Sequence, residues 1–208
     1  GVAAVVDRLR QIEPKLLIAV DGVHYGDKAH DRSGIVRQLR QELTTVQSLL
    51  LVRTPDAAEQ LPCELQWQDA VAQDDAEVAA FKPEWLPFDH PVWIVYSSGT
   101  TGLPKPIVHG QGGILMSMAL SGIHYDLGSS YGENNVGERF HWYSSTGWVM
   151  WNAQLSGLAM GTTVCIYDGH PAGSTTKPDW SVLWRFVSRH RVTFFGAGAA
   201  YFANCMKA

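Results

Sequence analysis

A run of hydroxyl residues and glycines that ends in a lysine has the chemistry of a polyphosphate-binding loop. It reads Ser-Ser-Gly-Thr-Thr-Gly-Leu-Pro-Lys over residues 97–105. Hydroxyls donate hydrogen bonds to phosphate oxygens, glycine lets the backbone approach a ligand closely, and lysine adds a mobile positive charge. Inward-facing backbone amides of such a loop form a concave anion site. The residues expected to contact a nucleoside triphosphate are Ser97, Ser98, Gly99, Thr100, Thr101, Gly102 and Lys105.

A run rich in glycine, serine and threonine is more often a simple surface turn. Here residues 92–96, Val-Trp-Ile-Val-Tyr, read as a buried strand, so the loop would leave the end of a sheet, where ligands of α/β proteins bind. The Pro-Lys pair that closes the run also favours a binding loop. The sequence contains neither the Gly-x4-Gly-Lys-Ser/Thr phosphate loop nor a Gly-x-Gly-x-x-Gly motif opening a helix. We therefore expect a nucleotide site of a different kind.

Aromatic residues gather in a second segment, residues 139–152. It reads Arg-Phe-His-Trp-Tyr-Ser-Ser-Thr-Gly-Trp-Val-Met-Trp-Asn and holds three tryptophans within ten residues. Such a cluster usually packs in a hydrophobic core. It could also line a pocket for an acyl group, because such a pocket is a part of the core left open. Both interpretations stand on the residues alone.

These two segments together resemble a known superfamily. Residues 96–105, Tyr-Ser-Ser-Gly-Thr-Thr-Gly-Leu-Pro-Lys, are similar to the phosphate loop of the adenylate-forming enzymes, which include acyl-CoA synthetases, peptide-synthetase adenylation domains and luciferases. Within that superfamily, residues 142–152 resemble acetoacetyl-CoA synthetases more than acetyl-CoA synthetases. The resemblance is continuous from about His90 onward and thinner before it. It is supported further by residues 105–110, 167–169 and 192–196.

The resemblance implies an ATP-dependent acid-thiol ligase. A carboxylate, here acetoacetate, would attack the α-phosphate of ATP to give an acyl-adenylate and pyrophosphate, and coenzyme A would then take the acyl group. Lys105 would stabilise the charge that develops on the phosphates. The acyl site would be bordered by Thr146, Gly147 and Trp148, with Asn152 as a further pocket residue. Mg2+ is expected as well, but with no ligand in this chain.

The resemblance leaves two alternatives open. The acid could instead be acetate, propionate or another short-chain acid. The chain could also be a folded scaffold or interaction piece without turnover. We expect it to be a fragment of the large N-terminal domain that lacks the C-terminal domain and is inactive by itself.

The composition gives no sign of a nucleic-acid or membrane partner, and the resemblance implies small-molecule partners, namely acetoacetate, ATP and coenzyme A. The 208 residues are 46% hydrophobic and 17% charged and carry a formal net charge of -4, so there is no basic footprint for nucleic acid. No apolar run approaches the roughly 20 residues that span a bilayer. Cys63, Cys165 and Cys205 are few and widely spaced, which predicts a reducing, cytoplasmic compartment. The histidines lack metal-ligand spacing. The sequence does not determine the oligomeric state.

The first part of the chain reads as a strand-helix-strand unit over residues 1–53. Residues 16–20 and 48–52 are apolar strand-like runs, and Ile35, Val36, Leu39 and Leu43 between them fall at helical spacing. Residues 54–89 contain four prolines up to position 87 and weak periodicity, so they read as a connecting segment with one short helix.

Residues 90–208 read as the part that carries the phosphate loop and the acyl pocket. After the loop we expect a short strand at 107–108 and a helix with Ile114, Leu115, Met118 and Gly122 on one face. Further along, we expect a strand at 162–167, a helix at 180–187 and a strand-to-helix unit at 194–206. Alternating strands and helices predict an α/β fold with a largely parallel sheet flanked by helices. By the resemblance this is a partial N-terminal domain of the adenylate-forming fold.

Overall fold

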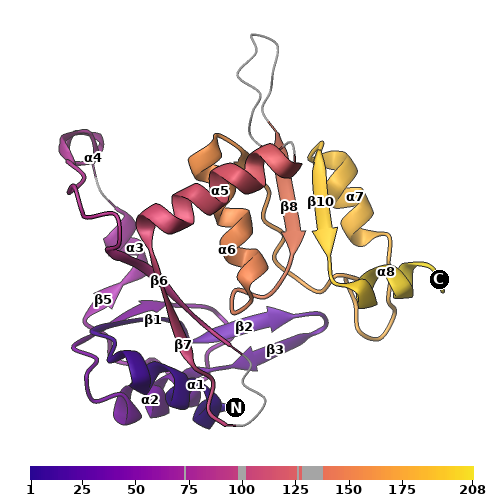
Figure 1. The fold of residues 1–208 in the computed structure, drawn as a ribbon. Helices are drawn as coiled ribbons and strands as arrows, with labels where there is room; N and C mark the ends of the chain where they lie inside the picture. The colour runs from indigo at the N-terminus through magenta and orange to yellow at the C-terminus, as the bar shows by residue number, and fades with distance from the viewer. Residues whose placement is uncertain (73, 98–101, 126, 128–137) are drawn as a thin grey trace. The chain divides into compact units, whose positions relative to one another are not determined.

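The computed structural model describes residues 1–72, 74–97, 102–125, 127 and 138–208 (Figure 1). Its contacts divide the chain into two compact units. Unit 1 comprises residues 1–87 and 91–108, and unit 2 comprises residues 88–90 and 109–208. Each unit has a parallel sheet and a hydrophobic core cluster of its own.

Unit 1 is built on a three-stranded parallel sheet in the order β1-β4-β5, with β1 (Leu16–Val20), β4 (Ser48–Val52) and β5 (Leu65–Gln66). The helix α2 (Ser33–Glu42) lies between β1 and β4 in the sequence and directly precedes β4, as the apolar spacing predicted. Leu17 and Leu51 point from the sheet into the core, where α1 (Val2–Leu9) and α2 cover this face. On the opposite face Ile18 is 59% exposed, whereas its register partner Leu50 is buried.

Four elements in the first part of unit 1 were not expected from the sequence. The helix α1 continues into a 3-10 turn, η1 (Arg10–Ile12), and contributes Val6 to the core. The strands β2 (Gly22–Tyr25) and β3 (Lys28–Asp31) form an antiparallel hairpin. Its turn contains Gly26 at φ 62°, a left-handed conformation that glycine adopts without strain.

The connecting segment contains more helix than expected. It forms α3 (Trp67–Val71) and α4 (Asp75–Ala80) where the sequence predicted one short helix. Asp74 caps α4, since its carboxylate accepts a hydrogen bond of 2.7 Å from the Glu77 backbone N–H. Leu61 near the start of the segment is buried in the core of unit 1, whereas Trp85 near its end is 96% exposed.

The strands on either side of the phosphate loop pair with each other. They are β6 (Pro91–Tyr96) and β7 (Pro106–Gly110), and β7 leads directly into α5 (Gln111–Tyr125). The predicted helix is therefore present. Of its predicted inner face, Gly122 is buried, whereas Leu115 is 55% exposed.

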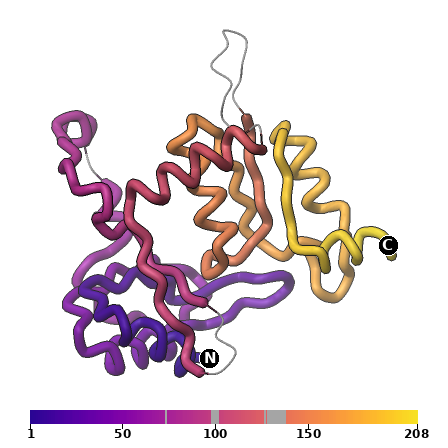
Figure 2. The backbone as a smooth tube through the Cα atoms, in the orientation of Figure 1, coloured from indigo at the N-terminus to yellow at the C-terminus, as the bar shows by residue number. Residues whose placement is uncertain are grey.

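Unit 2 is built on a second parallel sheet in the order β10-β8-β9, with β8 (Arg139–Tyr143), β9 (Thr163–Val164) and β10 (Phe194–Ala197). Figure 2 shows β10, in yellow, beside β8, although the two are far apart in sequence. The helices are α6 (Val149–Ser156), the 3-10 turn η2 (Gly157–Met160), α7 (Val182–Arg189) and α8 (Ala199–Cys205). Leu183 of α7 is fully buried against Tyr201 of α8.

The α/β class with parallel strands and flanking helices is confirmed. The described strands form two separate three-stranded parallel sheets, one hairpin and the β6-β7 pair, rather than one continuous sheet. The expected strand at 162–167 is shortened to two residues, but Cys165 after it is buried, as predicted. No helix in the described part of the chain is long and apolar enough to cross a membrane.

Candidate functional site

The two ends of the phosphate loop meet where β6 ends and β7 begins. The Ser97 backbone N–H donates a hydrogen bond of 3.1 Å to the Lys105 carbonyl and so closes the loop at its base. The Ser97 residue is half-buried, and both Gly102 and Lys105 are exposed. The predicted contacts at Ser98, Gly99, Thr100 and Thr101 lie outside the described residues.

The Lys105 ammonium forms no ion pair within the described residues. An exposed ammonium that none of the described carboxylates neutralises is available to an anionic ligand. The hydroxyl of Ser97 lies at the same loop base. The described part of the loop thus offers a cation and a hydroxyl donor, which are groups that bind phosphate.

A second candidate site lies at the carboxyl ends of β8 and β10. Because the two strands are parallel, their carboxyl ends lie at the same edge of the sheet, which is where ligands of α/β proteins bind. A cavity of about 340 Å3 opens there. It is lined by Trp142, Tyr143, Ser144, Ser145, Trp148, Met150 and Gly198.

Of the four residues expected around an acyl group, the structure brings Trp148 to this cavity. The indole is 61% exposed and precedes the first residue of α6. The neighbouring Thr146 and Gly147 are exposed in the turn before it and are not among the lining residues. Asn152 is half-buried on α6 and does not line the cavity either; its carbonyl accepts a 2.8 Å hydrogen bond from the Ser156 hydroxyl.

The cavity wall is held by contacts that sequence reasoning missed. The Trp142 backbone N–H donates to the side-chain carbonyl of Gln154, a buried residue of α6, and the Tyr143 hydroxyl donates a 3.1 Å bond to the Gly169 carbonyl. On the other side, Trp142 packs directly over Gly196 of β10. The aromatic motif was visible in the sequence, but the pairing of β8 with β10 was the missing signal.

His141, next to the aromatic motif, is a core residue. Its side chain is 2% exposed, its Nδ1 lies 2.8 Å from the Cys165 carbonyl, and its ring stacks on Phe195 at a centroid distance of 5.7 Å. Burial lowers the pKa of His141, which the Cys165 hydrogen bond opposes. The imidazole is therefore held neutral, with Nδ1 as the donor to the carbonyl.

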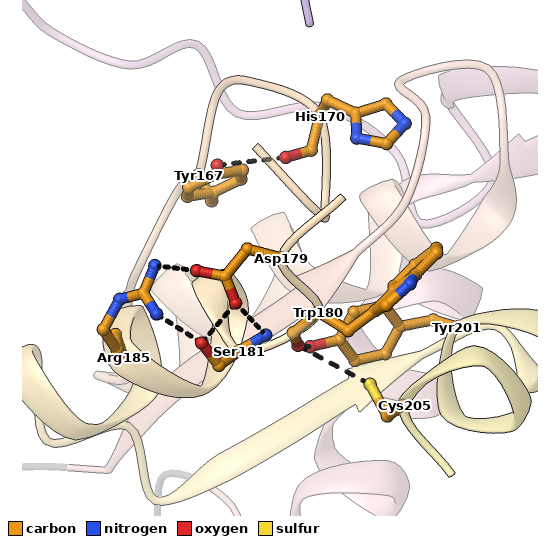
Figure 3. Close-up of polar contacts among 8 residues, drawn as sticks. All are labelled: Tyr167, His170, Asp179, Trp180, Ser181, Arg185, Tyr201 and Cys205. Carbon is orange, nitrogen blue, oxygen red and sulfur yellow. Dashed lines mark hydrogen bonds and ion pairs between the residues drawn. The ribbon is translucent and has the colours of Figure 1, made fainter. Parts of the chain in front are cut away.

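A larger hollow of about 510 Å3 lies near α7 and α8, but its polar groups bind one another (Figure 3). The Asp179 carboxylate accepts bonds from Arg185 at 2.8 Å and from Ser181, and these contacts lower the pKa of Asp179 to about 2. The Trp180 carbonyl accepts bonds from Tyr201 and from the Cys205 thiol. This cluster anchors the start of α7 rather than presenting groups to a ligand. Across the described residues, no three histidine, cysteine or acidic side chains gather as a metal site.

The sequence matches the profile of one enzyme family, described as AMP-binding enzyme, over residues 1–208. The chain belongs to the AMP-binding enzyme family. The expected relationship to the adenylate-forming superfamily is confirmed.

Among curated members of the AMP-binding enzyme family, the chain is 34% identical to acetoacetyl-CoA synthetase of Danio rerio, over 98% of this chain and 30% of that protein. It is 37% identical to acetoacetyl-coenzyme A synthetase of Rhizobium meliloti (strain 1021), over 97% and 29%. It is 33% identical to malonamoyl-CoA synthetase of Penicillium aethiopicum, over 98% and 29%. The chain thus spans about 30% of the length of the curated relatives it matches.

A solved structure of an AMP-binding enzyme, acetoacetyl-CoA synthetase from Streptomyces lividans, is similar over the whole of this chain. The identity is 43% and the TM-score 0.84, and the match covers 100% of this chain and 30% of the solved one. This likeness confirms the expected fold, part of the N-terminal domain of adenylate-forming enzymes.

Proposed function

We propose that these residues belong to a longer ATP-dependent acid-thiol ligase, which joins acetoacetate to coenzyme A through an acyl-adenylate and releases AMP. One observation carries the choice of acid. The relatives are named for acetoacetyl and malonamoyl groups, and both groups have a carbonyl at the third carbon of a short acid. A pocket that pairs with that carbonyl distinguishes these acids from their saturated analogues.

The proposed role of the phosphate loop is electrostatic. A carboxylate is a weak nucleophile and pyrophosphate is a highly charged leaving group, so the reaction depends on positioning and on stabilising negative charge. We assign Ser97, Gly102 and Lys105 to the ATP phosphates, with Lys105 acting most strongly as charge moves onto pyrophosphate. The remaining proposed phosphate contacts are Ser98, Gly99, Thr100 and Thr101.

Mg2+ is proposed as a companion of ATP. The described residues bring together no cluster of metal-ligating groups, so we assign it no ligand here.

The proposed acid site is the cavity beside Trp148. This indole would close the far end of the pocket and limit the length of the acid. The Trp148 Nε1–H and the Ser145 hydroxyl are donors on the cavity wall that could pair with the third-carbon carbonyl. Thr146, Gly147 and Asn152 are proposed as neighbouring residues on the resemblance alone.

We propose functional segments at residues 1–53, 54–89 and 90–208, a cytoplasmic location, and a role in ketone-body and lipid metabolism. These rest on the composition, the sequence patterns and the likeness to the synthetases.

ATP-pyrophosphate exchange and hydroxamate formation test the function. Both are measured on the full-length protein and on the 208-residue chain with acetoacetate, acetate, propionate and butyrate. We expect acetoacetate to give the highest kcat/KM in the full-length protein and no turnover in the chain alone. A higher kcat/KM for acetate or propionate would identify the alternative ligase, and no exchange with any acid would favour a scaffold.

The variant Lys105→Ala tests the phosphate loop. We expect it to lower the exchange rate by about 10- to 1000-fold, the scale of losing one electrostatic contact in the transition state. Lys82→Ala is the matched control, because Lys82 is also exposed and lies outside the loop. Equal rates in the two variants would contradict the assignment of Lys105.

A further inference from the structure

We propose that Tyr96 and Gln11 are positioning residues, which fasten the two ends of the phosphate loop to the end of α1 and to η1. The inference rests on the proposed function, in which Ser97 and Lys105 contact the phosphates of ATP. Neither Tyr96 nor Gln11 is assigned to the nucleotide itself. All the contacts involved lie within unit 1.

The first fastening is at the entry to the loop. Tyr96 is the last residue of β6, and its hydroxyl donates a hydrogen bond of 2.6 Å to the Arg8 carbonyl. Arg8 lies in the last turn of α1, where helix carbonyls can accept bonds from outside the helix. Burial raises the pKa of Tyr96, against the opposing charge of Arg8, so the phenol stays protonated as the donor.

The second fastening is at the exit from the loop. Gln11 lies in η1, and its side-chain Nε2 donates a 2.9 Å bond to the Pro104 carbonyl and a 2.8 Å bond to the Asp7 carbonyl. An amide nitrogen carries two hydrogens, so both bonds can form together. Pro104 directly precedes Lys105. The side chain of Gln11 therefore joins the end of α1 to the residue before the proposed catalytic cation.

The segment formed by α1 and η1, to which both loop ends bond, is anchored to the rest of unit 1. Val6 of α1 is 4% exposed and packs with the buried leucines of the sheet. Arg10 pairs with the Glu42 carboxylate and so ties η1 to the end of α2. The two loop ends are also joined by the backbone bond from Ser97 to Lys105. Movement of either end would displace a phosphate-binding group, and a displacement of about 1 Å can cost about 100-fold in rate.

The test uses two variants of the full-length protein that remove only the donors, Tyr96→Phe and Gln11→Met. Equilibrium binding of ATP is measured first, and then KM for ATP and KM for acetoacetate in pyrophosphate exchange. We expect each variant to weaken ATP binding and raise KM for ATP by about threefold to tenfold, the range for losing one hydrogen bond, with KM for acetoacetate unchanged.

Matched controls separate positioning from general stability. Tyr201→Phe removes the same kind of bond, a tyrosine hydroxyl to a backbone carbonyl at 3.1 Å, but in unit 2 (Figure 3). Gln38→Met makes the same substitution as Gln11→Met on an exposed face of α2. Neither control should change the affinity for ATP, although Tyr201→Phe should lower the unfolding temperature.

Two results would overturn the inference. One is unchanged ATP affinity in both loop-end variants. The other is an equal loss of ATP affinity in Tyr96→Phe and Tyr201→Phe, since that would reflect stability alone. Wild-type protein that binds ATP without turnover on any acid would overturn the proposed function but leave the positioning test intact, whereas wild-type protein that binds no ATP would overturn both.

Discussion

Trp148 combines two properties at one residue: it lines the 340 Å3 cavity and it remains 61% exposed. An indole that served only the core would be expected to lie deeper. The exposed ring is therefore well placed to meet a substrate. Its bulk should limit the acid to a short chain, and its N–H should favour an acid that carries an acceptor.

We predict that Trp148→Gly in the full-length protein admits longer acids and lowers the preference for acetoacetate over butyrate. Adding or removing one methylene of the substrate changes selectivity by only about 1 to 3 kcal/mol. Losing a hydrogen bond between the pocket and the substrate changes selectivity by more than that. The measurement is kcat/KM for acetoacetate, butyrate and hexanoate. Trp85→Gly is the control, because that indole is exposed and outside the cavity. A fall in unfolding temperature with an unchanged acid ranking would make Trp148 a packing residue.

The burial of His141 predicts that the stability of the fold depends on pH. Its pKa is lowered in the folded state by burial, so the unfolded chain binds the proton more readily. The stabilisation from the neutral imidazole is therefore complete above the unfolded pKa of about 6.5 and is lost as the pH falls below it. We predict that the unfolding temperature declines between pH 7 and pH 5, and that His141→Asn flattens this decline. The control is His124→Asn, which should not flatten the decline because His124 is exposed.

At the scale of elements, the cavity depends on how closely β10 approaches β8. Gly196 lies opposite Trp142 in the parallel register, and a Cβ atom on Gly196 would fall 2.1 Å from Cε3 of that indole. A Cβ atom essentially never lies this close to an atom to which it is not bonded. Any side chain at residue 196 must therefore displace Trp142, which forms part of the cavity wall.

We predict that Gly196→Ala raises KM for the acid and destabilises the protein by about 1 to 3 kcal/mol, the usual cost of overpacking. The measurements are steady-state kinetics and denaturant unfolding. Gly34→Ala is the control, since a Cβ there meets nothing within 4 Å. Normal KM and stability in Gly196→Ala would show that the indole can move without consequence.

Strands and helices with strong local patterns could be predicted from the sequence. The strands β1 and β4 lie at the expected residues because each is a continuous apolar run, and α5 and α7 follow from helical spacing. The hairpin of β2 and β3 was missed because its strands mix polar and apolar residues on short, largely exposed faces. The end of β9 depends on its partner, since only the first two residues of β8 pair with it.

The two candidate sites differ in the same way. The phosphate loop could be predicted because its residues are consecutive and their chemistry is local. The acyl cavity could be predicted only in part. Gly198 lines it together with Trp142 and Trp148 because β10, which ends just before Gly198, pairs with β8. That pairing follows from tertiary packing, which a local pattern in one sequence does not reveal.

At the scale of the whole molecule, the hydrophobic core is divided. One buried cluster consists of residues of unit 1, including Leu51, and the other consists of residues of unit 2, including Leu183. Both leucines are 0% exposed. A substitution in one cluster thus removes contacts from that cluster and not from the other, because the two clusters share no residues.

We predict that Leu51→Ala and Leu183→Ala each cost about 2 to 5 kcal/mol of stability, as buried leucines do. Hydrogen exchange measured by mass spectrometry should quicken first around residues 16–52 in Leu51→Ala and around residues 182–205 in Leu183→Ala. Leu158→Ala, at a 61% exposed residue, should change neither. Identical exchange profiles in the two buried variants would mean that the chain unfolds as one cooperative body.

The strand order β10-β8-β9 has a consequence for synthesis on the ribosome. All buried residues of the unit 1 cluster lie at or before Leu61 in the sequence, so this core can form early in translation. The strand β8 must wait for β10, because among the strands that the structure describes its only other partner is the two-residue β9. During that interval the nascent chain presents an aromatic strand with one unpaired edge, the kind of surface that chaperones recognise and that misassembles when chains are crowded.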